Sequence, residues 1–171
     1  AALGITTFND VSGGDYETYR FIADAGATYV LMHTKGTPQT MQINPSYSDV
    51  VREVENYLLK KTQSLKERGV SPERIIWDTG IGFGKTVEHN LRLIAAHPHL
   101  RKHGYPLLAG VSRKSFIGKI LDGREAEDRL FATLGVQTYL TLRGCDILRV
   151  HDVKEMADIL RILSHLVQYE F

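Results

Sequence analysis

The stretch Thr28-Tyr-Val-Leu-Met-His-Thr-Lys-Gly36 decides the fold class of this 171-residue sequence. Its first part, Thr28–Met32, is a mainly apolar run without polar alternation, and its second part, His33 to Gly36, is mainly polar. A continuous run of this kind is typical of a parallel strand covered by helices. Four similar runs, rich in β-branched and aliphatic residues, lie at Leu3–Val11, Ile75–Asp78, Pro106–Gly110 and Asp146–Val150.

Longer stretches with helical periodicity separate these runs. One helical face is predicted from Tyr47, Val50, Val51, Val54, Tyr57, Leu58 and Leu65, and another from Met156, Ile159, Leu160, Leu163, Leu166 and Val167. Shorter helices are expected near Asp15–Ala25, Val87–Ala96 and Arg124–Leu142. This alternation predicts an α/β domain with about five consecutive βα units.

Polar residues follow each of the apolar runs. They are Asn9 and Asp10, His33 to Gly36, Asp78 and Gly80, Ser112 to Ser115, and the group Arg149, His151 and Asp152. All strands of a βα-barrel end at one rim, so these groups would converge there. A doubly wound sheet would instead gather its ligand groups at one crevice. We therefore expect part of a TIM (β/α)8 barrel.

Composition excludes several classes of function. The chain has 21 Lys and Arg against 20 Asp and Glu, so its formal charge of +1 predicts no nucleic-acid or membrane partner. A single cysteine excludes a disulfide framework and fits a reducing compartment. The first residues, Ala1 to Ile5, include no initiator Met, no basic region and no hydrophobic stretch of a signal peptide, and they resemble the middle of a protein. A cytoplasmic location is expected, with import into an organelle left open.

The segment Asp78-Thr-Gly-Ile-Gly-Phe-Gly-Lys-Thr86 is similar to two nucleotide-binding motifs, the phosphate-binding P-loop and the dinucleotide fingerprint, but it satisfies neither of them. Thr79 occupies the first glycine position of a phosphate-binding P-loop, and Lys85 occupies the third glycine position of the dinucleotide fingerprint. What remains is a carboxylate followed by three glycines, which let the backbone approach a ligand closely. Phe83 is expected to face the cleft; the alternative is packing against a neighbouring loop.

The segment Gly110-Val-Ser-Arg-Lys-Ser-Phe-Ile-Gly118 is predicted to open a helix. Ser112 and Ser115 are good capping residues. Arg113 and Lys114 place two cations at the helix end where the dipole disfavours them, which suggests a negatively charged or electron-rich ligand. Two solvated surface cations are the alternative explanation.

The segment Arg149-Val-His-Asp152 places Arg149 and His151 on one side of the last predicted strand. A guanidinium suits phosphate, and an imidazole adds a donor or accepts a proton. The alternative is a structural hydrogen bond between His151 and Asp152. The pair His97-Pro98-His99 is interpreted as surface, because its spacing offers no third metal ligand.

Together these stretches resemble the dihydropteroate synthase family. The matching segments and residues are Asn9–Gly14, Leu31–His33 with Gly36, Pro38, Met41 and Gln42, Gly80–Lys85 with His89–Leu91, Pro106–Leu108, Gly110, Ser112–Gly118, and Leu148–Val153. They follow the family's order and cover nearly the whole chain. One departure is Thr79, where the family usually has proline; the carboxylate of Asp78 is kept.

The resemblance implies condensation of 6-hydroxymethyl-7,8-dihydropterin diphosphate with p-aminobenzoate, giving 7,8-dihydropteroate and diphosphate. It places Asn9, Met32, Asp78, Gly110 and Lys114 around the pterin. It places Phe83 and Ser115 towards p-aminobenzoate, with the Lys114 stem between the substrates. Arg149 and His151 would hold the diphosphate, aided by magnesium (Mg²⁺). No protein nucleophile is implied.

The resemblance also implies that residues 1–171 form a partial pterin-binding domain, equivalent to the last five units of the eight-stranded barrel. The family's magnesium ligand would lie in the missing part, the complete enzyme would be a homodimer and a sulfonamide target, and this fragment alone would be inactive. An open sheet would leave two long unpaired edges and an exposed apolar inner face. A pterin-dependent methyltransferase and a non-catalytic pterin-binding fragment stay open as alternatives.

Overall fold

A computed structural model describes residues 4–36 and 45–169. Its strands are β1 (Thr7–Asp10), β2 (Thr28–Met32), β3 (Ile75–Asp78), β4 (Leu107–Ala109) and β5 (Ile147–Leu148). Its α-helices are α1 (Tyr16–Ala25), α2 (Val50–Glu67), α3 (Val87–Ala95), α4 (His97–Leu100), α5 (Ser115–Ile120), α6 (Leu130–Leu142) and α7 (Val153–Leu166). Short 3-10 helices are η1 (Pro72–Arg74), η2 (Arg101–His103), η3 (Ala126–Arg129) and η4 (Val167–Tyr169).

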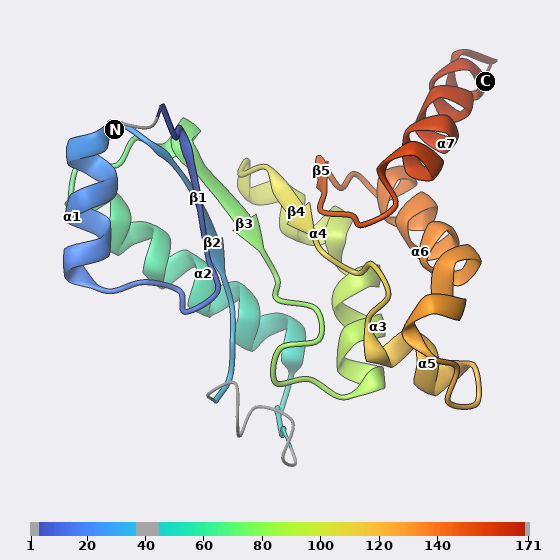
Figure 1. Cartoon of the computed structure of the whole chain (residues 1–171). Helices are drawn as coiled ribbons and strands as arrows, with labels where there is room; N and C mark the ends of the chain where they lie inside the picture. Colours follow the sequence, from blue (N-terminus) through green and yellow to red (C-terminus); the bar gives the residue numbers. More distant parts are fainter. Residues whose placement is uncertain (1–3, 37–44, 170–171) are drawn as a thin grey trace.

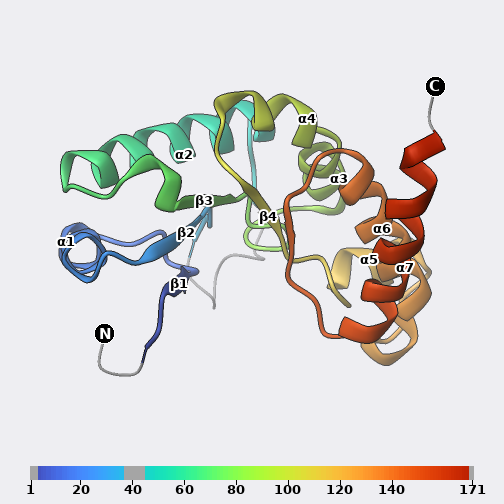
Figure 2. The same ribbon diagram turned by 90° about the horizontal axis from the view of Figure 1, so that it is seen from above.

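The strands form one parallel sheet in the order β1-β2-β3-β4-β5, with helices between them in the chain (Figure 1). The sheet curves, and α2, α3 and α4 lie along its outer side (Figure 2). This arrangement confirms the expected partial barrel. Among the described residues, β1 and β5 each pair on one side only, so the two expected open edges are present, but with 4 and 2 residues they are short rather than long.

The register assigns alternate residues to the two faces of the sheet. Met32 lies opposite Asp78, and Asp78 lies opposite Leu108. Their neighbours Leu31, Trp77 and Leu107 belong to the core between the sheet and the helices. Met32, Asp78 and Leu108 therefore share the inner, concave face.

The core contains residues from the sheet and from the helices that cover its outer face. Val54 and Leu58 from α2 and Leu93 from α3 are fully buried together with Trp77. Burying a large apolar side chain contributes about 1.5–3 kcal/mol. The helical face predicted around Val50 to Leu65 is thus confirmed as the inner face of α2.

The expectation of an exposed apolar inner face is wrong for much of the concave side. Val30, Met32 and Leu108 are 2%, 0% and 6% exposed. Side chains on the inside of a curved sheet converge and cover one another, as they do in a barrel interior. The concave face is therefore packed up to the strand ends.

Some boundaries differ from those predicted. The run from Leu3 to Val11 gives only β1, with Leu3 outside the described residues, and the run from Asp146 to Val150 gives only β5. Both are edge strands with a single hydrogen-bonded neighbour, which limits the length of the ladder. The stretch Arg124–Leu142 contains η3 followed by α6 rather than one helix.

The last predicted helix is confirmed as α7, but most of its apolar face is exposed. Met156 is its one buried residue, whereas Leu160 and Leu166 are 39% and 59% exposed. Phe131 on α6 is 85% exposed. Within the described part of the chain, none of the helices combines the length and apolar character needed to cross a membrane.

Candidate functional site

Arg149 connects the ends of three strands on the concave side. Its Nη1 donates to Asn9 Oδ1, and its Nη2 donates to Asp78 Oδ2 at 3.2 Å. Asn9 lies in β1, Asp78 ends β3 and Arg149 follows β5. The structure thus brings together three of the predicted site residues that are far apart in the sequence.

Asp78 accepts hydrogen bonds with both carboxylate oxygens. Its side chain is 1% exposed, and Oδ1 accepts from the Gly80 backbone N–H at 2.7 Å while Oδ2 accepts from Arg149. Asp78 is therefore both the cap of the following turn and a buried anion paired with a guanidinium. A buried anion of this kind depends on its partners, because an unpaired one would be costly.

Gly110 permits the close approach of Arg149. A Cβ added at Gly110 would lie 2.6 Å from Arg149 Nη2. Gly110 follows β4 directly, so the end of the fourth strand also lies beside this guanidinium. Met32 is fully buried at the end of β2, opposite Asp78 in the register.

The glycine-containing turn after β3 lies in close contact with the loop after β2. Gly80 and Gly84 both have φ of +65°, and an added Cβ would lie 1.8 Å from His33 O at Gly80 and 2.3 Å from Lys35 O at Gly84. Tyr47 Oη donates to Gly84 O at 2.8 Å. Glycine is thus required here both by conformation and by the close approach of the two loops.

Lys85 and His33 form a buried pair that sequence reasoning missed. Lys85 is 4% exposed, and its Nζ lies 3.0 Å from His33 Nδ1, 2.9 Å from Gly80 O and 2.9 Å from Phe83 O. Nζ donates to the two carbonyl oxygens, and the direction of the contact with His33 Nδ1 depends on the tautomer of the imidazole and on the protonation of Lys85. Only the position of Lys85 at the end of the glycine segment hinted at this role.

Burial shifts the pKa values of both groups. It lowers the pKa of Lys85 to about 7, although the charge of Asp78 opposes the shift. Burial, followed by the positive charge of Lys85, lowers the pKa of His33 to about 3. His33 is therefore neutral at physiological pH.

Lys114 and Phe83 lie against each other. Lys114 Nζ donates to Ile81 O and lies 4.6 Å from the centre of the Phe83 ring. Burial lowers the pKa of Lys114 to about 8; Asp78 opposes this shift and Arg149 adds to it. Phe83 is half-buried, so it packs under Lys114.

Arg113 does not present a free charge to a ligand, contrary to expectation. Its Nε donates to Asp152 Oδ2 at 3.1 Å and its Nη2 donates to Oδ1. Its backbone has φ of +55°, an unusual conformation for a non-glycine residue. The Asp152 carboxylate supplies the negative charge that the sequence suggested for a ligand.

Neither predicted serine caps the helix. Ser115 is the first residue of α5 and is exposed, and Lys114 occupies the cap position without a side-chain cap. Ser112 Oγ lies 2.9 Å from His151 Nδ1. The alternative of a His151–Asp152 bond is thus replaced by a bond to Ser112. Since β5 ends before Arg149, strand alternation does not govern Arg149 and His151.

The surface interpretation of the His97–His99 pair is wrong for His97. His97 is fully buried at the start of α4, and its Nδ1 lies 3.1 Å from Leu93 O and 3.2 Å from Ile94 O in the last turn of α3. His99 is exposed and lies beside Glu55 and His103, a group that does not include His97.

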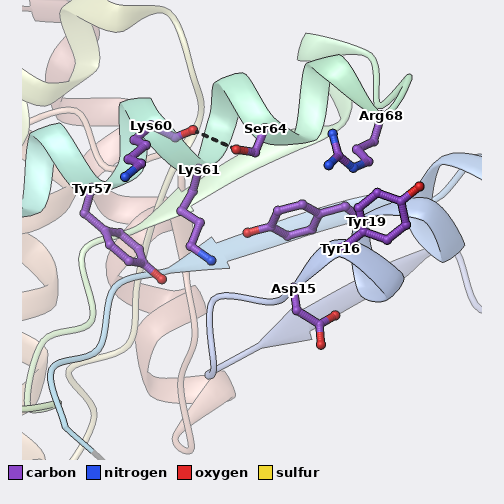
Figure 3. A pocket seen from close by; sticks show the side chains of 8 residues that line it. All are labelled: Asp15, Tyr16, Tyr19, Tyr57, Lys60, Lys61, Ser64 and Arg68. Carbon is purple, nitrogen blue, oxygen red and sulfur yellow. Dashed lines mark hydrogen bonds between the residues drawn. The ribbon is translucent and has the colours of Figure 1, made fainter.

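A cavity of about 440 Å³ lies between α1 and α2 (Figure 3). None of the predicted site residues lines it. Its lining residues are Asp15, Tyr16, Tyr19, Tyr57, Lys60, Lys61, Ser64 and Arg68. Lys61 Nζ donates to Gly14 O at 2.9 Å, and the Arg68 guanidinium lies 4.3 Å from the Tyr16 ring centre. Two of its cations are therefore already engaged within the chain.

The described residues near Arg149 do not form a metal site by themselves. The one group of three histidine, cysteine, aspartate or glutamate ligands found among the described residues is Glu55, His99 and His103. These residues belong to the outer helical layer. The described residues beside Asp78 and Arg149 therefore supply too few ligands to hold a magnesium ion by themselves. A role for Mg²⁺ stays a prediction.

The family model described as pterin binding enzyme matches residues 1–151. Dihydropteroate synthase of Synechocystis sp. is 41% identical over 165 residues, covering 95% of this chain and 57% of the relative. The Neisseria meningitidis serogroup B synthase is 43% identical over 170 residues, covering 95% of this chain and 59% of the relative. The chain thus spans less than two thirds of the length of these relatives.

Solved structures of dihydropteroate synthases share the fold. The Stenotrophomonas maltophilia enzyme has a TM-score of 0.95 and 34% identity, covering 99% of this chain and 64% of its own. The Xanthomonas albilineans enzyme in complex with 7,8-dihydropteroate has a TM-score of 0.90 and 33% identity, with the same coverage. The Thermus thermophilus enzyme, in complex with 6HMPPP or with 4-aminobenzoate, has a TM-score of 0.91 and 32% identity; it covers 97% of this chain and 66% or 68% of its own.

Proposed function

This chain belongs to the family of pterin-binding enzymes, and from that premise we propose that its protein is a dihydropteroate synthase. The reaction joins 6-hydroxymethyl-7,8-dihydropterin diphosphate to p-aminobenzoate and releases diphosphate. The observation that carries the proposal is the bridge from Arg149 to Asn9 and Asp78 at the strand ends. It places an anion that suits a pterin ring beside a cation that suits a diphosphate.

Asp78 is the proposed anchor of the pterin. The amino-pyrimidinone edge of the ring carries adjacent N–H donors, and a buried carboxylate accepts such donors with high selectivity. Oδ1 already accepts from Gly80, so the ring would bind at Oδ2, where Arg149 now donates. Asn9, Met32, Gly110 and Lys114 would complete the pterin pocket.

Arg149 is the proposed diphosphate ligand. Its side chain is 39% exposed and its guanidinium has five donors, which match phosphate oxygens in pairs. When a pterin takes Oδ2 of Asp78, the guanidinium turns to the diphosphate of the same substrate. Arg149 would thus couple binding of the pterin at one end of the substrate site to binding of the diphosphate at the other end.

The chemical step requires positioning and charge stabilisation rather than a nucleophile on the protein. The bond between the pterin methylene carbon and the diphosphate oxygen breaks, and its electron pair leaves with diphosphate. The amino nitrogen of p-aminobenzoate attacks the resulting pterin cation and then loses a proton. Lys114 and Arg149 would stabilise the departing negative charge. Magnesium, when bound, would neutralise further charge on the diphosphate.

Phe83 and Ser115 are proposed on the p-aminobenzoate side. Ser115 is exposed at the start of α5, and Phe83 lies under Lys114, so the lysine stem stands between the two proposed regions. His151 would assist Arg149 at the diphosphate. A cytoplasmic location and a homodimer are also proposed; exposed apolar residues on α6 and α7, such as Phe131 and Ile162, are compatible with a further interface.

The direct test is product formation by the full-length protein that contains this sequence. Incubation with the pterin diphosphate and p-aminobenzoate should yield dihydropteroate, measured by chromatography. Arg149→Ala should lose most of this activity, whereas Arg161→Ala, which changes an exposed arginine of α7, should keep it. Tight pterin binding without any product would identify a non-catalytic pterin-binding protein instead.

A further inference from the structure

Glu55, His99 and His103 form a compact cluster on the outer helical layer. Glu55 lies in α2, His99 in α4 and His103 in η2. His99 Nε2 is 2.8 Å and His103 Nε2 is 2.6 Å from the same oxygen, Glu55 Oε1. The three ligand atoms lie within 4.8 Å of one another, and no other group of this kind was found among the described residues.

Two imidazoles and one carboxylate are a ligand set that Zn²⁺ uses with a fourth position left to water. His99 and His103 are four residues apart across consecutive helical turns, which places both rings on one side. Zinc bonds of about 2.0–2.2 Å would bring neighbouring ligand atoms to roughly 3.4 Å. The side chains of His99 and His103 are 53% and 30% exposed, so their rings have room to make this small adjustment.

The cluster is held in place by the core beneath it. The Glu55 side chain is 15% exposed and follows Val54, which is fully buried. The His103 ring lies 5.4 Å from the ring of Trp77, which stacks on Tyr105 at 4.8 Å. Both imidazoles contact the same carboxylate oxygen, so the three ligand atoms already face one another.

We propose that Glu55, His99 and His103 form a Zn²⁺ site that fastens α2 to the α4–η2 segment. Each imidazole would bind the ion through Nε2 and carry its proton on Nδ1, and water would fill the fourth position. Imidazole ligands favour zinc over magnesium, which prefers oxygen. This site is separate from the proposed substrate site, and no magnesium role is assigned to it.

The test uses full-length, tag-free protein stripped of metal with a chelator. Titration with Zn²⁺ against a chromophoric chelator should show a site that is weakened at least tenfold by His99→Ala, by His103→Ala and by Glu55→Gln. Because a ligand of the folded state raises stability, Zn²⁺ should also raise the melting temperature, and each variant should lose that rise. A large excess of Mg²⁺ should not displace the ion.

His165→Ala, which removes an exposed histidine of α7, is the matched control and should keep both effects. Equal zinc affinity and equal zinc-dependent melting in the wild type and in His99→Ala would overturn the proposal. A loss in His165→Ala as large as in His99→Ala would overturn it too, since binding would then be spread over surface histidines. If His103→Ala does not fold, His99→Ala decides alone, because that side chain is the more exposed of the two.

Discussion

Arg149 and Asp78 combine a structural role, seen in their contacts within the chain, with a proposed role in binding the substrate. Asp78 caps the turn through Oδ1 and pairs with Arg149 through Oδ2. The two oxygens separate the functions, because only Oδ2 is needed by the proposed pterin. Substitutions that change one oxygen but keep the other therefore distinguish a structural from a binding role.

Asp78→Asn should weaken pterin binding at least tenfold in the full-length protein. Asparagine keeps an oxygen for the Gly80 N–H but opposes a donor to the ring donors, at a cost of about 1–3 kcal/mol. Asp146→Asn is the matched control, since Asp146 also caps a backbone N–H, that of Leu107, and pairs with Arg101. Calorimetric titration with a pterin, together with thermal melts, measures both effects. Unchanged pterin affinity with a lowered melting temperature would assign Asp78 to structure alone.

Arg149→Ala should separate the two ends of the substrate. Loss of a charge-assisted contact costs about 2–4 kcal/mol, so affinity for the diphosphate-bearing pterin should fall roughly thirtyfold or more. Affinity for a pterin without phosphates should not fall, because Oδ2 of Asp78 becomes available. Titration with both ligands measures this, with Arg161→Ala as control. Equal losses for both ligands would mean that Arg149 only shapes the pocket.

At the scale of elements, the sequence predicted central strands better than edges. The bounds of β2 and β3 agree with the apolar runs, and the central strand β4 is one residue shorter at each end than Pro106–Gly110. The edge strands β1 and β5 lose more residues, since each has a single hydrogen-bonded neighbour. Asn9, Asp78 and Arg149 could be found because each lies at or near the end of an apolar run.

Other contacts depend on the folded chain and could not be predicted from local pattern. Lys85 reaches His33 only because three glycines with positive φ turn the chain back towards β2. Arg113 finds its partner Asp152 at a separation of 39 residues, and Glu55 finds His99 at a separation of 44. Pairings of this length have no signature in a single sequence. Pro38, Met41 and Gln42, part of the family resemblance, lie outside the described residues.

The turn between β3 and α3 should show a pH-dependent stability that originates in Lys85. Because burial lowers its pKa to about 7, the unfolded chain binds a proton that the folded chain lacks from about pH 7 to about pH 10. The free energy of unfolding therefore rises with pH in this range, by up to about 1.4 kcal/mol per pH unit. Lys85→Met should remove this rise and leave the carbonyls of Gly80 and Phe83 without their donor.

Urea unfolding of the wild type, Lys85→Met and the exposed-site control Lys60→Met at pH 7 and pH 9 measures the effect. The stability difference between the wild type and Lys85→Met should grow with pH, while Lys60→Met should follow the wild type. A constant difference would show that Lys85 keeps an ordinary pKa, with its three acceptors outweighing burial.

At the scale of the whole molecule, the described sheet and helices leave much apolar surface exposed. The edges at β1 and β5 are each paired on one side, and Phe131, Ile162 and Leu166 are 85%, 60% and 59% exposed. The relatives are longer, since this chain spans 57% and 59% of the two that were compared. A closed barrel would pair both edges and complete the substrate site.

A polypeptide of residues 1–171 alone should therefore associate and show no synthase activity. Unpaired parallel edges template further pairing, and exposed apolar helices add to it. Size-exclusion chromatography and the product assay measure this. Co-expression with the part of the Neisseria meningitidis synthase that has no counterpart in this chain should give a discrete species and some activity, because the added strands supply partners for both edges. A monomeric, cooperatively melting and fully active polypeptide of 171 residues would show instead that the five-stranded sheet is sufficient by itself.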